Sequence, residues 1–294
     1  MSVTQIEAPV AVRNILFATD FTEASSKALK YTEAIARHFQ ASVTSTHVLR
    51  ASVADWPKFG TDPEYKKLYA KTKEMLDNVG RQLDQAGFKA DEVLFEGDPV
   101  DCIVKAIQHR RVDLLVLGTH GSRDLERLVL GSTAEEILRK AACPVLTVGP
   151  NVPDPCQGTV LFRRVLLATD FTPESAAAVP YAFAFAAEPS SHVTICHVLP
   201  EGHTRTMDAT QLQEKFIEAA RKLVSEEMWR KSAAESVVEY GDAADEILKL
   251  ATKQEVDLIV LGAHSGGIIA THLAAGVAFR VIAGAACPVL TIHR

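Results

Sequence analysis

The feature that most constrains the fold of this chain is an internal duplication. Four sequence blocks of the first half return in the same order in the second half. Leu16–Thr22 matches Leu166–Thr172 at an offset of 150 residues, and Val112–His120 matches Val256–His264 at an offset of 144. Chance similarity does not reproduce several blocks in one order. The chain is therefore predicted to contain two copies of one domain.

A segment rich in proline and glycine marks the predicted boundary between the copies. The first copy is expected to occupy residues 1–150 and the second residues 164–294, with a linker at 151–163. A length of 294 residues agrees with two domains of ordinary size.

In each copy, short apolar segments alternate with stretches in which apolar residues recur at the spacing of a helix. In the first copy we expect strands at Asn14–Thr19, Ser42–Leu49, Glu92–Glu96, Leu114–Leu117 and Val145–Val148. We expect helices at Glu23–Gln40, Glu64–Gln85, Val100–Arg110 and Ala134–Ala142. Apolar strands separated by helices are typical of a parallel sheet covered on both faces. The predicted fold class is therefore α/β, with two tandem open parallel sheets. Asp98 before Pro99 predicts a capped helix start, which Asp242 repeats.

Composition excludes several classes of protein. The net charge of −6 offers no electrostatic reason to bind nucleic acid, and no run approaches the ~20 apolar residues of a membrane span. Residues 1–12 show no signal-peptide pattern. The cysteines are odd in number and show no metal-binding spacing, which favours buried, reduced thiols. We expect a cytoplasmic protein without nucleic-acid or membrane partners.

Two strand ends in the first copy predict a ligand site. One is Ala18-Thr19-Asp20, and the other is Gly118-Thr119-His120-Gly121. After Gly121 and nine further residues, Gly131-Ser132-Thr133 precedes a helix. Ligands bind at the carboxyl ends of strands in open parallel sheets. Glycines permit close backbone approach and positive φ, and a helix start offers unpaired N–H groups to an anion. We therefore expect a phosphate here, with Arg123 and Arg127 as candidate cations.

Structural interpretations of the same residues stand beside this one. Asp20 alone is equally explained as a polar residue near a helix start, and Ser132 with Glu135 fits a capping box. Gly118 and Gly121 also suit a tight turn. His47 and His197 are interpreted as hydrogen-bonded core histidines, and His120 and His264 as loop residues.

A family resemblance rests on these motifs. Gly118, Gly121, Gly131 and Ser132 combine with Thr19-Asp20-Phe21, His47-Val48 and Cys143-Pro144-Val145. In this pattern both copies resemble universal stress protein domains, over nearly the whole chain. The resemblance implies a nucleotide α-hydrolase-like fold with five strands in the order 3-2-1-4-5. It also implies ATP in the crevice between strands 1 and 4.

The resemblance assigns nine residues of the first copy to ATP. The adenine and ribose would be surrounded by Ala18, Thr19, Asp20 and Val48. The triphosphate would be held by Gly118, Gly121, Gly131, Ser132 and Thr133. Mg²⁺ would be bridged by phosphate oxygens, with no metal ligand from the protein. Glu135 and Glu136 would have to point away from the nucleotide.

The second copy departs from the pattern. At a constant offset the counterparts of Gly121, Gly131, Ser132 and Thr133 are Ser265, Ala275, Gly276 and Val277. We expect weak or absent triphosphate binding there, and a structural role as partner of the first copy. The resemblance suggests intramolecular pairing of the last strands, Pro144–Val148 with Pro288–Ile292, and leaves a homodimer open.

The function expected is that of an ATP-binding regulatory stress-response protein with an unknown protein partner. The alternatives are a ligand-free scaffold and a slow ATPase. No catalytic residue is predicted, because no base–nucleophile pair is recognisable. A nucleotidyl transferase or ATP pyrophosphatase would need a His-x-x-His or S-G-G-x-D-S signature, which the sequence lacks.

Overall fold

The computed structural model describes residues 10–50, 62–119, 130–155, 162–186, 191–201, 209–223, 225–263 and 272–293. The chain divides into two compact units, of which one is Ala11–Val160 and the other includes Leu161–Arg294. Among the described helices none is long and apolar enough to span a membrane.

The first unit alternates strands and helices throughout. Its elements are β1 (Asn14–Ala18), α1 (Glu23–Phe39), β2 (Ser42–Arg50), α2 (Pro63–Gln85), β3 (Ala90–Gly97), α3 (Pro99–Arg110), β4 (Leu114–Gly118), α4 (Ser132–Lys140) and β5 (Val145–Val148). All the paired strands run parallel, in the order β3-β2-β1-β4-β5. The predicted strand order is confirmed.

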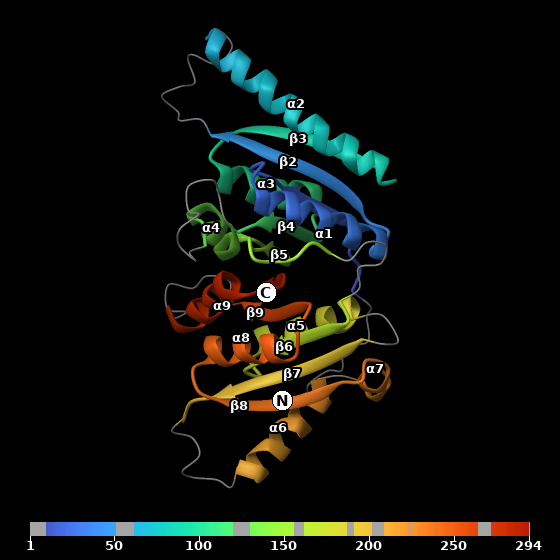
Figure 1. Cartoon of the computed structure of the whole chain (residues 1–294), viewed down its shortest axis with the longest axis vertical. Coiled ribbons are helices and arrows are strands. Elements are labelled where there is room, and N and C mark those ends of the chain that lie inside the picture. Colours follow the sequence, from blue (N-terminus) through green and yellow to red (C-terminus); the bar gives the residue numbers. More distant parts are fainter. Residues whose placement is uncertain are drawn as a thin grey trace. The chain divides into compact units, whose positions relative to one another are not determined.

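The second unit repeats this arrangement. Its elements are β6 (Arg164–Ala168), α5 (Pro173–Phe185), β7 (His192–Leu199), α6 (Ala209–Leu223), α7 (Glu226–Lys231), β8 (Glu235–Tyr240), α8 (Ala243–Lys253), β9 (Leu258–Ala263), α9 (His272–Gly284) and β10 (Val289–His293). The order is β8-β7-β6-β9-β10, again parallel. The helices α6 and α7 stand where the first unit has α2 alone (Figure 1).

The central strands form the core of each unit. Leu16 in β1, Leu115 in β4 and Leu146 in β5 are fully buried, as is Leu166 in β6. Burying one such side chain contributes about 1.5–3 kcal/mol. Both faces of these strands are covered by helices, which explains why their sequences are apolar without alternation.

Helix starts follow the predicted caps. The Asp98 carboxylate accepts hydrogen bonds from the N–H groups of Val100 (3.0 Å) and Asp101 (3.1 Å), and Pro99 is the first residue of α3. Asp242 caps α8 in the same way. Both predictions are confirmed.

Part of the proline-rich segment after β5 is fixed to the first unit. Lys27 Nζ donates to the carbonyl of Pro150 at 2.6 Å, and the Tyr31 hydroxyl donates to the carbonyl of Pro153 at 3.1 Å. Val152 is buried. Residues 150–153 therefore pack against α1 rather than forming a free tether.

The order of the strands defines where a ligand can enter. β1 lies between β2 and β4, with Ala18 opposite Leu117 in the register. The chain leaves β1 towards β2 and leaves β4 towards β5, so the two connections diverge. A crevice is expected where neighbouring connections of a parallel sheet leave in opposite directions.

Candidate functional site

A cavity of about 610 Å³ lies at this point in the first unit. Its volume falls within the roughly 300–1,000 Å³ typical of small-molecule sites. The lining residues come from the ends of β1, β2 and β4 and from the starts of α3 and α4: Ala18, Thr19, Asp20, Thr46, His47, Val48, Arg50, Pro99, Ile103, Leu117, Gly118, Thr119, Gly131, Ser132, Thr133, Ala134 and Ile137.

The fold brings eight of the nine predicted residues to this cavity. They are Ala18, Thr19, Asp20, Val48, Gly118, Gly131, Ser132 and Thr133. The ninth, Gly121, lies outside the described residues, as do His120, Arg123 and Arg127.

Helix α4 begins differently from the prediction. Its first residue is Ser132, two residues before the predicted start, and Gly131 is the N-cap without a side-chain hydrogen bond. The capping-box interpretation of Ser132 and Glu135 is therefore wrong. The Glu135 amide bonds to the carbonyl of Gly131 (2.9 Å). The first turn of α4 thus presents its N–H groups at the cavity, and its N-cap residue supplies no side chain to accept from them.

Gly118 and Gly131 do not adopt unusual backbone angles, and the role of Gly118 comes from its missing side chain. Gly131 has φ −59° and ψ 139°, which other residues also adopt. Positive φ among the described glycines occurs only at Gly87, Gly97 and Gly241. A Cβ on Gly118 would stand 2.8 Å from the Ser25 nitrogen, in the backbone of α1. The expectation of positive φ is wrong at Gly118 and Gly131, and Gly118 is required by the approach of α1.

Arg50 is the cation that the sequence interpretation missed. It ends β2, and its guanidinium donates to Thr133 Oγ1 at 3.3 Å across the cavity mouth. No other Lys or Arg is among the described lining residues. A difference between the two copies could have drawn attention to Arg50. Arg50 follows His47-Val48-Leu49 in the first copy, whereas Pro200 follows His197-Val198-Leu199 in the second.

Asp20 holds the turn after β1 and also faces the cavity. Its Oδ1 accepts from the Thr22 amide (3.1 Å) and the Thr22 hydroxyl (2.5 Å). Thr22, not Asp20, caps α1. Phe21 between them adopts φ 60°, a left-handed conformation that costs about 1–2 kcal/mol for such a residue. Both interpretations of Asp20, as a turn residue and as a cavity residue, therefore hold.

His47 is satisfied by the fold. Its Nδ1 lies 2.7 Å from the carbonyl oxygen of Thr19, so Nδ1 carries the proton and donates. The ring packs against Phe21 at a centroid distance of 4.6 Å. His197 makes the same bond to Thr169 in the second unit. The predicted hydrogen bonds of both histidines are confirmed, but both side chains are half-buried and line their cavities, so the expected position in the core is wrong.

Acidic groups near α4 are turned to the helix surface. Glu135 pairs with Arg139 at 2.8 Å, and Glu136 pairs with Lys140 at 2.7 Å. Neither glutamate lines the cavity. Among the described residues of α4, these two carboxylates therefore stay out of the cavity lining.

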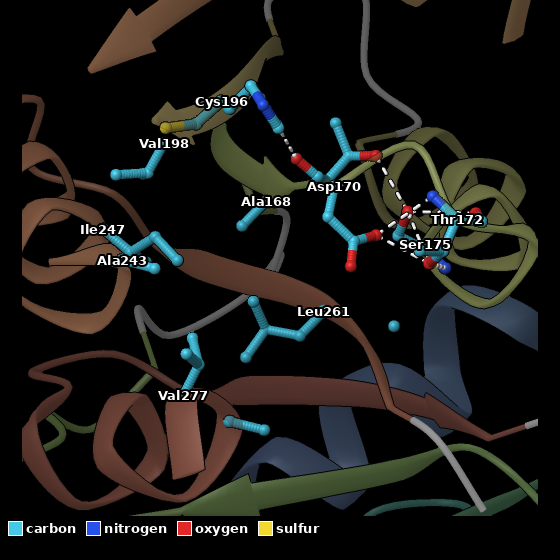
Figure 2. Close-up of a pocket in the computed structure, with 14 residues that line it drawn as sticks. Ala168, Asp170, Thr172, Ser175, Cys196, Val198, Ala243, Ile247, Leu261 and Val277 are labelled. Atoms are coloured by element: carbon cyan, nitrogen blue, oxygen red, sulfur yellow. Dashed lines mark hydrogen bonds between the residues drawn. The ribbon is translucent and has the colours of Figure 1, made fainter. Parts of the chain in front are cut away.

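The second unit has a smaller cavity, of about 190 Å³ (Figure 2). It is lined by Ala168, Thr169, Asp170, Thr172, Ser175, Cys196, His197, Val198, Ala243, Ile247, Leu261, Gly262, Val277 and Ala278. Val277 occupies the position of Thr133, and a Cβ on Gly276 would meet nothing within 4 Å.

The buried cysteines are inert thiols. Burial raises the pKa of Cys143, Cys196 and Cys287 to about 12. A thiol with such a pKa is almost wholly protonated at neutral pH and is a poor nucleophile. The expectation of buried, reduced cysteines is confirmed for these three.

The fold and the cavities define a class: a duplicated α/β protein of the nucleotide α-hydrolase-like type, with a pocket at the switch point of each sheet. The chain belongs to the universal stress protein family, whose sequence profile matches residues 11–149 and 161–293.

Individual relatives agree with this assignment. A universal stress protein of Methanocaldococcus jannaschii is 30% identical over 155 residues, which cover 47% of this chain and 96% of that protein. The YxiE protein of Bacillus subtilis is 26% identical over 46% of this chain and 97% of its own length. The crystal structure of a universal stress protein from Archaeoglobus fulgidus is similar in fold, with a TM-score of 0.72 over 97% of this chain and 98% of that one, at 23% identity.

Proposed function

We propose that the first unit binds Mg·ATP and that the chain is a regulatory stress-response protein of the cytoplasm. Occupancy of the first cavity by nucleotide would set the conformation that a protein partner recognises. The second unit would serve as a structural partner of the first.

One observation carries the proposal: the start of α4 opens into the cavity without a side-chain cap. The Ser132 and Thr133 hydroxyls and Arg50 stand at the same end. Unpaired amides and a helix dipole attract phosphate, and a guanidinium forms strong charge-assisted bonds to it.

Other lining residues of the cavity suit the nucleoside. The Asp20 carboxylate can accept a hydroxyl or amino hydrogen there, and Val48 and Ile103 offer apolar walls. A molecule with a single anionic end is expected to turn that end towards Arg50 rather than towards the Asp20 carboxylate. Mg²⁺ would enter with the nucleotide and be held by phosphate oxygens. Among the described residues no group of three or more His, Cys, Asp or Glu could hold a metal ion.

The test is a pair of matched variants titrated with Mg·ATP by isothermal calorimetry. Thr133→Val removes a hydroxyl and reproduces the second unit's Val277. We expect about tenfold weaker binding, since a hydrogen bond to a charged group contributes about 1.5–3 kcal/mol. Gly131→Val, which adds a branched side chain at the helix start, should weaken binding further. Circular dichroism would verify that both variants fold.

The control is Val277→Thr, which restores a hydroxyl in the second unit. It should leave the affinity for Mg·ATP unchanged. A change in the affinity for Mg·ATP with Val277→Thr as large as the change with Thr133→Val would contradict the assignment of ATP to the first unit. A wild-type chain that shows no heat and no thermal stabilisation with Mg·ATP would instead be a ligand-free scaffold.

Turnover is measured separately, by release of phosphate over hours at saturating Mg·ATP. Binding without turnover is expected for a regulatory protein. Rapid turnover with a second substrate would place the chain among enzymes.

A further inference from the structure

The segment that follows β5 lies along one face of α1. Lys27 Nζ donates to the carbonyl of Pro150 at 2.6 Å, and the Tyr31 hydroxyl donates to the carbonyl of Pro153 at 3.1 Å. Side chains four positions apart lie on the same face of a helix. Two backbone carbonyls of the segment are therefore bound by side chains one turn apart on α1.

Two further contacts hold the same segment. Val152 is buried, with 1% of its surface exposed. Lys30 Nζ pairs with Asp154 Oδ2 at 2.5 Å. These two side chains are 51% and 54% exposed, so solvent and salt weaken their attraction. We call the segment 150–154 and the three α1 side chains that hold it the latch.

The second copy lacks the two cations of the latch. At the offset of 150 residues, Ala177 stands in place of Lys27, and Pro180 in place of Lys30. Helix α5 still forms over Pro173–Phe185, with Pro180 inside it. The first helix of this fold therefore does not need the lysines. Their role in α1 is to bind the segment after β5.

The latch sets the length of chain between the two units. On the far side, Phe162 is 3% exposed, and its ring packs against Phe185 at a centroid distance of 5.9 Å within the second unit. With residues 150–154 held on α1, seven residues (155–161) connect the two anchored positions. Release of the latch raises this number to twelve (150–161). The maximum reach of the connection then rises from ~25 Å to ~40 Å.

Helix α1 begins at the first cavity. Thr19, which lines the cavity, donates from its hydroxyl to Ser25 Oγ at 3.1 Å. The backbone of α1 at Ala24 and Ser25 also lies against Gly118 of the cavity lining. Lys27 follows Ser25 by two residues in the same helix. A ligand that contacts Thr19 and Gly118 therefore opposes any opening of the fold that separates α1 from these strand ends.

We propose that the latch is a conformational switch controlled by the first cavity. An occupied cavity fixes the start of α1 and holds the latch closed, with a short connection between the units. Without ligand the start of α1 is held by fewer contacts, so the latch opens more often and the connection lengthens. The identity of the ligand, Mg·ATP, rests on the proposed function, and the switch names the route by which occupancy of that site acts on the rest of the chain.

The test compares hydrogen exchange and nucleotide affinity in the full chain. Exchange is read by mass spectrometry at the amides of residues 151, 152 and 154, because residues 150, 153 and 155 are prolines. Saturating Mg·ATP should slow this exchange about fivefold, within the usual range of coupling between two sites. Calorimetry on the same samples measures the affinity for Mg·ATP.

The first variant, Lys27→Met with Lys30→Met, removes both cations and keeps the length of the side chains. Without nucleotide its exchange at the three amides should be about tenfold faster than in the wild type, because hydrogen bonds from charged donors are lost. Coupling is reciprocal, so its affinity for Mg·ATP should fall by the same factor by which the nucleotide slows exchange in the wild type. The matched control is Lys66→Met with Lys67→Met, two exposed lysines of α2, which should change neither quantity.

Three results would overturn the switch: Mg·ATP bound to the wild type without slower exchange at the three amides, a latch variant that exchanges no faster, or a latch variant of unchanged affinity. A wild type that binds no Mg·ATP contradicts the proposed function itself, and the switch fails with it. Circular dichroism verifies folding. Should the lysine variant not fold, Val152→Ala with Asp154→Asn opens the latch from the segment and leaves α1 intact, and the same paired changes are expected.

Discussion

At the scale of single residues, Arg50 is the cation among the described lining residues of the first cavity, where we propose that phosphate binds. Arg50 is exposed, and its guanidinium donates a hydrogen bond of 3.3 Å to Thr133 Oγ1. A phosphate chain at the start of α4 would lie within reach of the same group. Because the position is exposed, solvent and salt weaken its electrostatic contribution.

Arg50→Gln should therefore weaken Mg·ATP binding about fivefold at low ionic strength, equivalent to ~1 kcal/mol. The difference from wild type should shrink as salt is added, which calorimetry at two salt concentrations would measure. Arg164→Gln is the control, because it removes the same charge from the second unit, where Arg164 pairs with Glu255 at 2.9 Å. An equal loss in both variants would mean that Arg50 acts only through net charge.

Arg50 also shows where residue patterns stop being informative. Arg50 and Thr133 are 83 positions apart, and only the fold brings the end of β2 beside the start of α4. Asp20, by contrast, was predicted because it ends a recognisable strand. Residues that follow a local pattern could be found from the sequence, whereas for Arg50 the sequence held only a difference between the copies, and its place beside Thr133 depends on tertiary packing.

At the scale of elements, the contact between β4 and α1 explains the role of Gly118. A Cβ at this position would lie 2.8 Å from the Ser25 nitrogen and 2.9 Å from the Ala24 carbonyl carbon. Both atoms belong to the backbone of α1, so no side-chain rotation relieves the clash. The helix itself must shift.

Gly118→Ala should lower the free energy of unfolding of the first unit by about 1–3 kcal/mol, the usual cost of overpacking. Gly276→Ala is the contrasting variant, because its Cβ would meet nothing within 4 Å. Inside α9 that change should be neutral or stabilising by up to ~1 kcal/mol, since alanine favours helix over glycine. Scanning calorimetry of the full chain would measure both. Equal stability of Gly118→Ala and wild type would contradict the packing role.

The starts of two helices show how far elements can be predicted. Asp98 and Pro99 encode the start of α3 locally, and the structure follows them. The start of α4 was predicted at Ala134 from the spacing of apolar residues, two residues later than the structure has it. The Gly131 amide instead bonds to the Thr119 carbonyl at 2.9 Å, which ties the returning chain to the end of β4. That long-range bond places the helix start, and no local pattern contains it.

At the scale of the whole molecule, duplication has produced two pockets of unequal chemistry. The strand orders of the two units are equivalent, so the sheets do not account for the difference. The cavities differ in volume, about 610 Å³ against about 190 Å³, and in several lining residues. An ancestral site used twice would be expected to bind two nucleotides. The second unit lacks equivalents of Arg50 and Thr133, which argues that the chain binds one nucleotide.

The full chain should bind one equivalent of Mg·ATP, measured by calorimetry on nucleotide-free protein. A ligand stabilises only the folded unit that binds it, by about 2.7 kcal/mol at a free concentration of 100 Kd. Because a two-domain chain need not unfold in one step, this gain should appear in a single calorimetric transition. In hydrogen exchange, Mg·ATP should protect peptides within residues 11–155, which would identify the first unit as the one that is stabilised. Two equivalents bound, or protection spread equally over both units, would show that the second cavity still accepts triphosphate although no Lys or Arg is among its described lining residues.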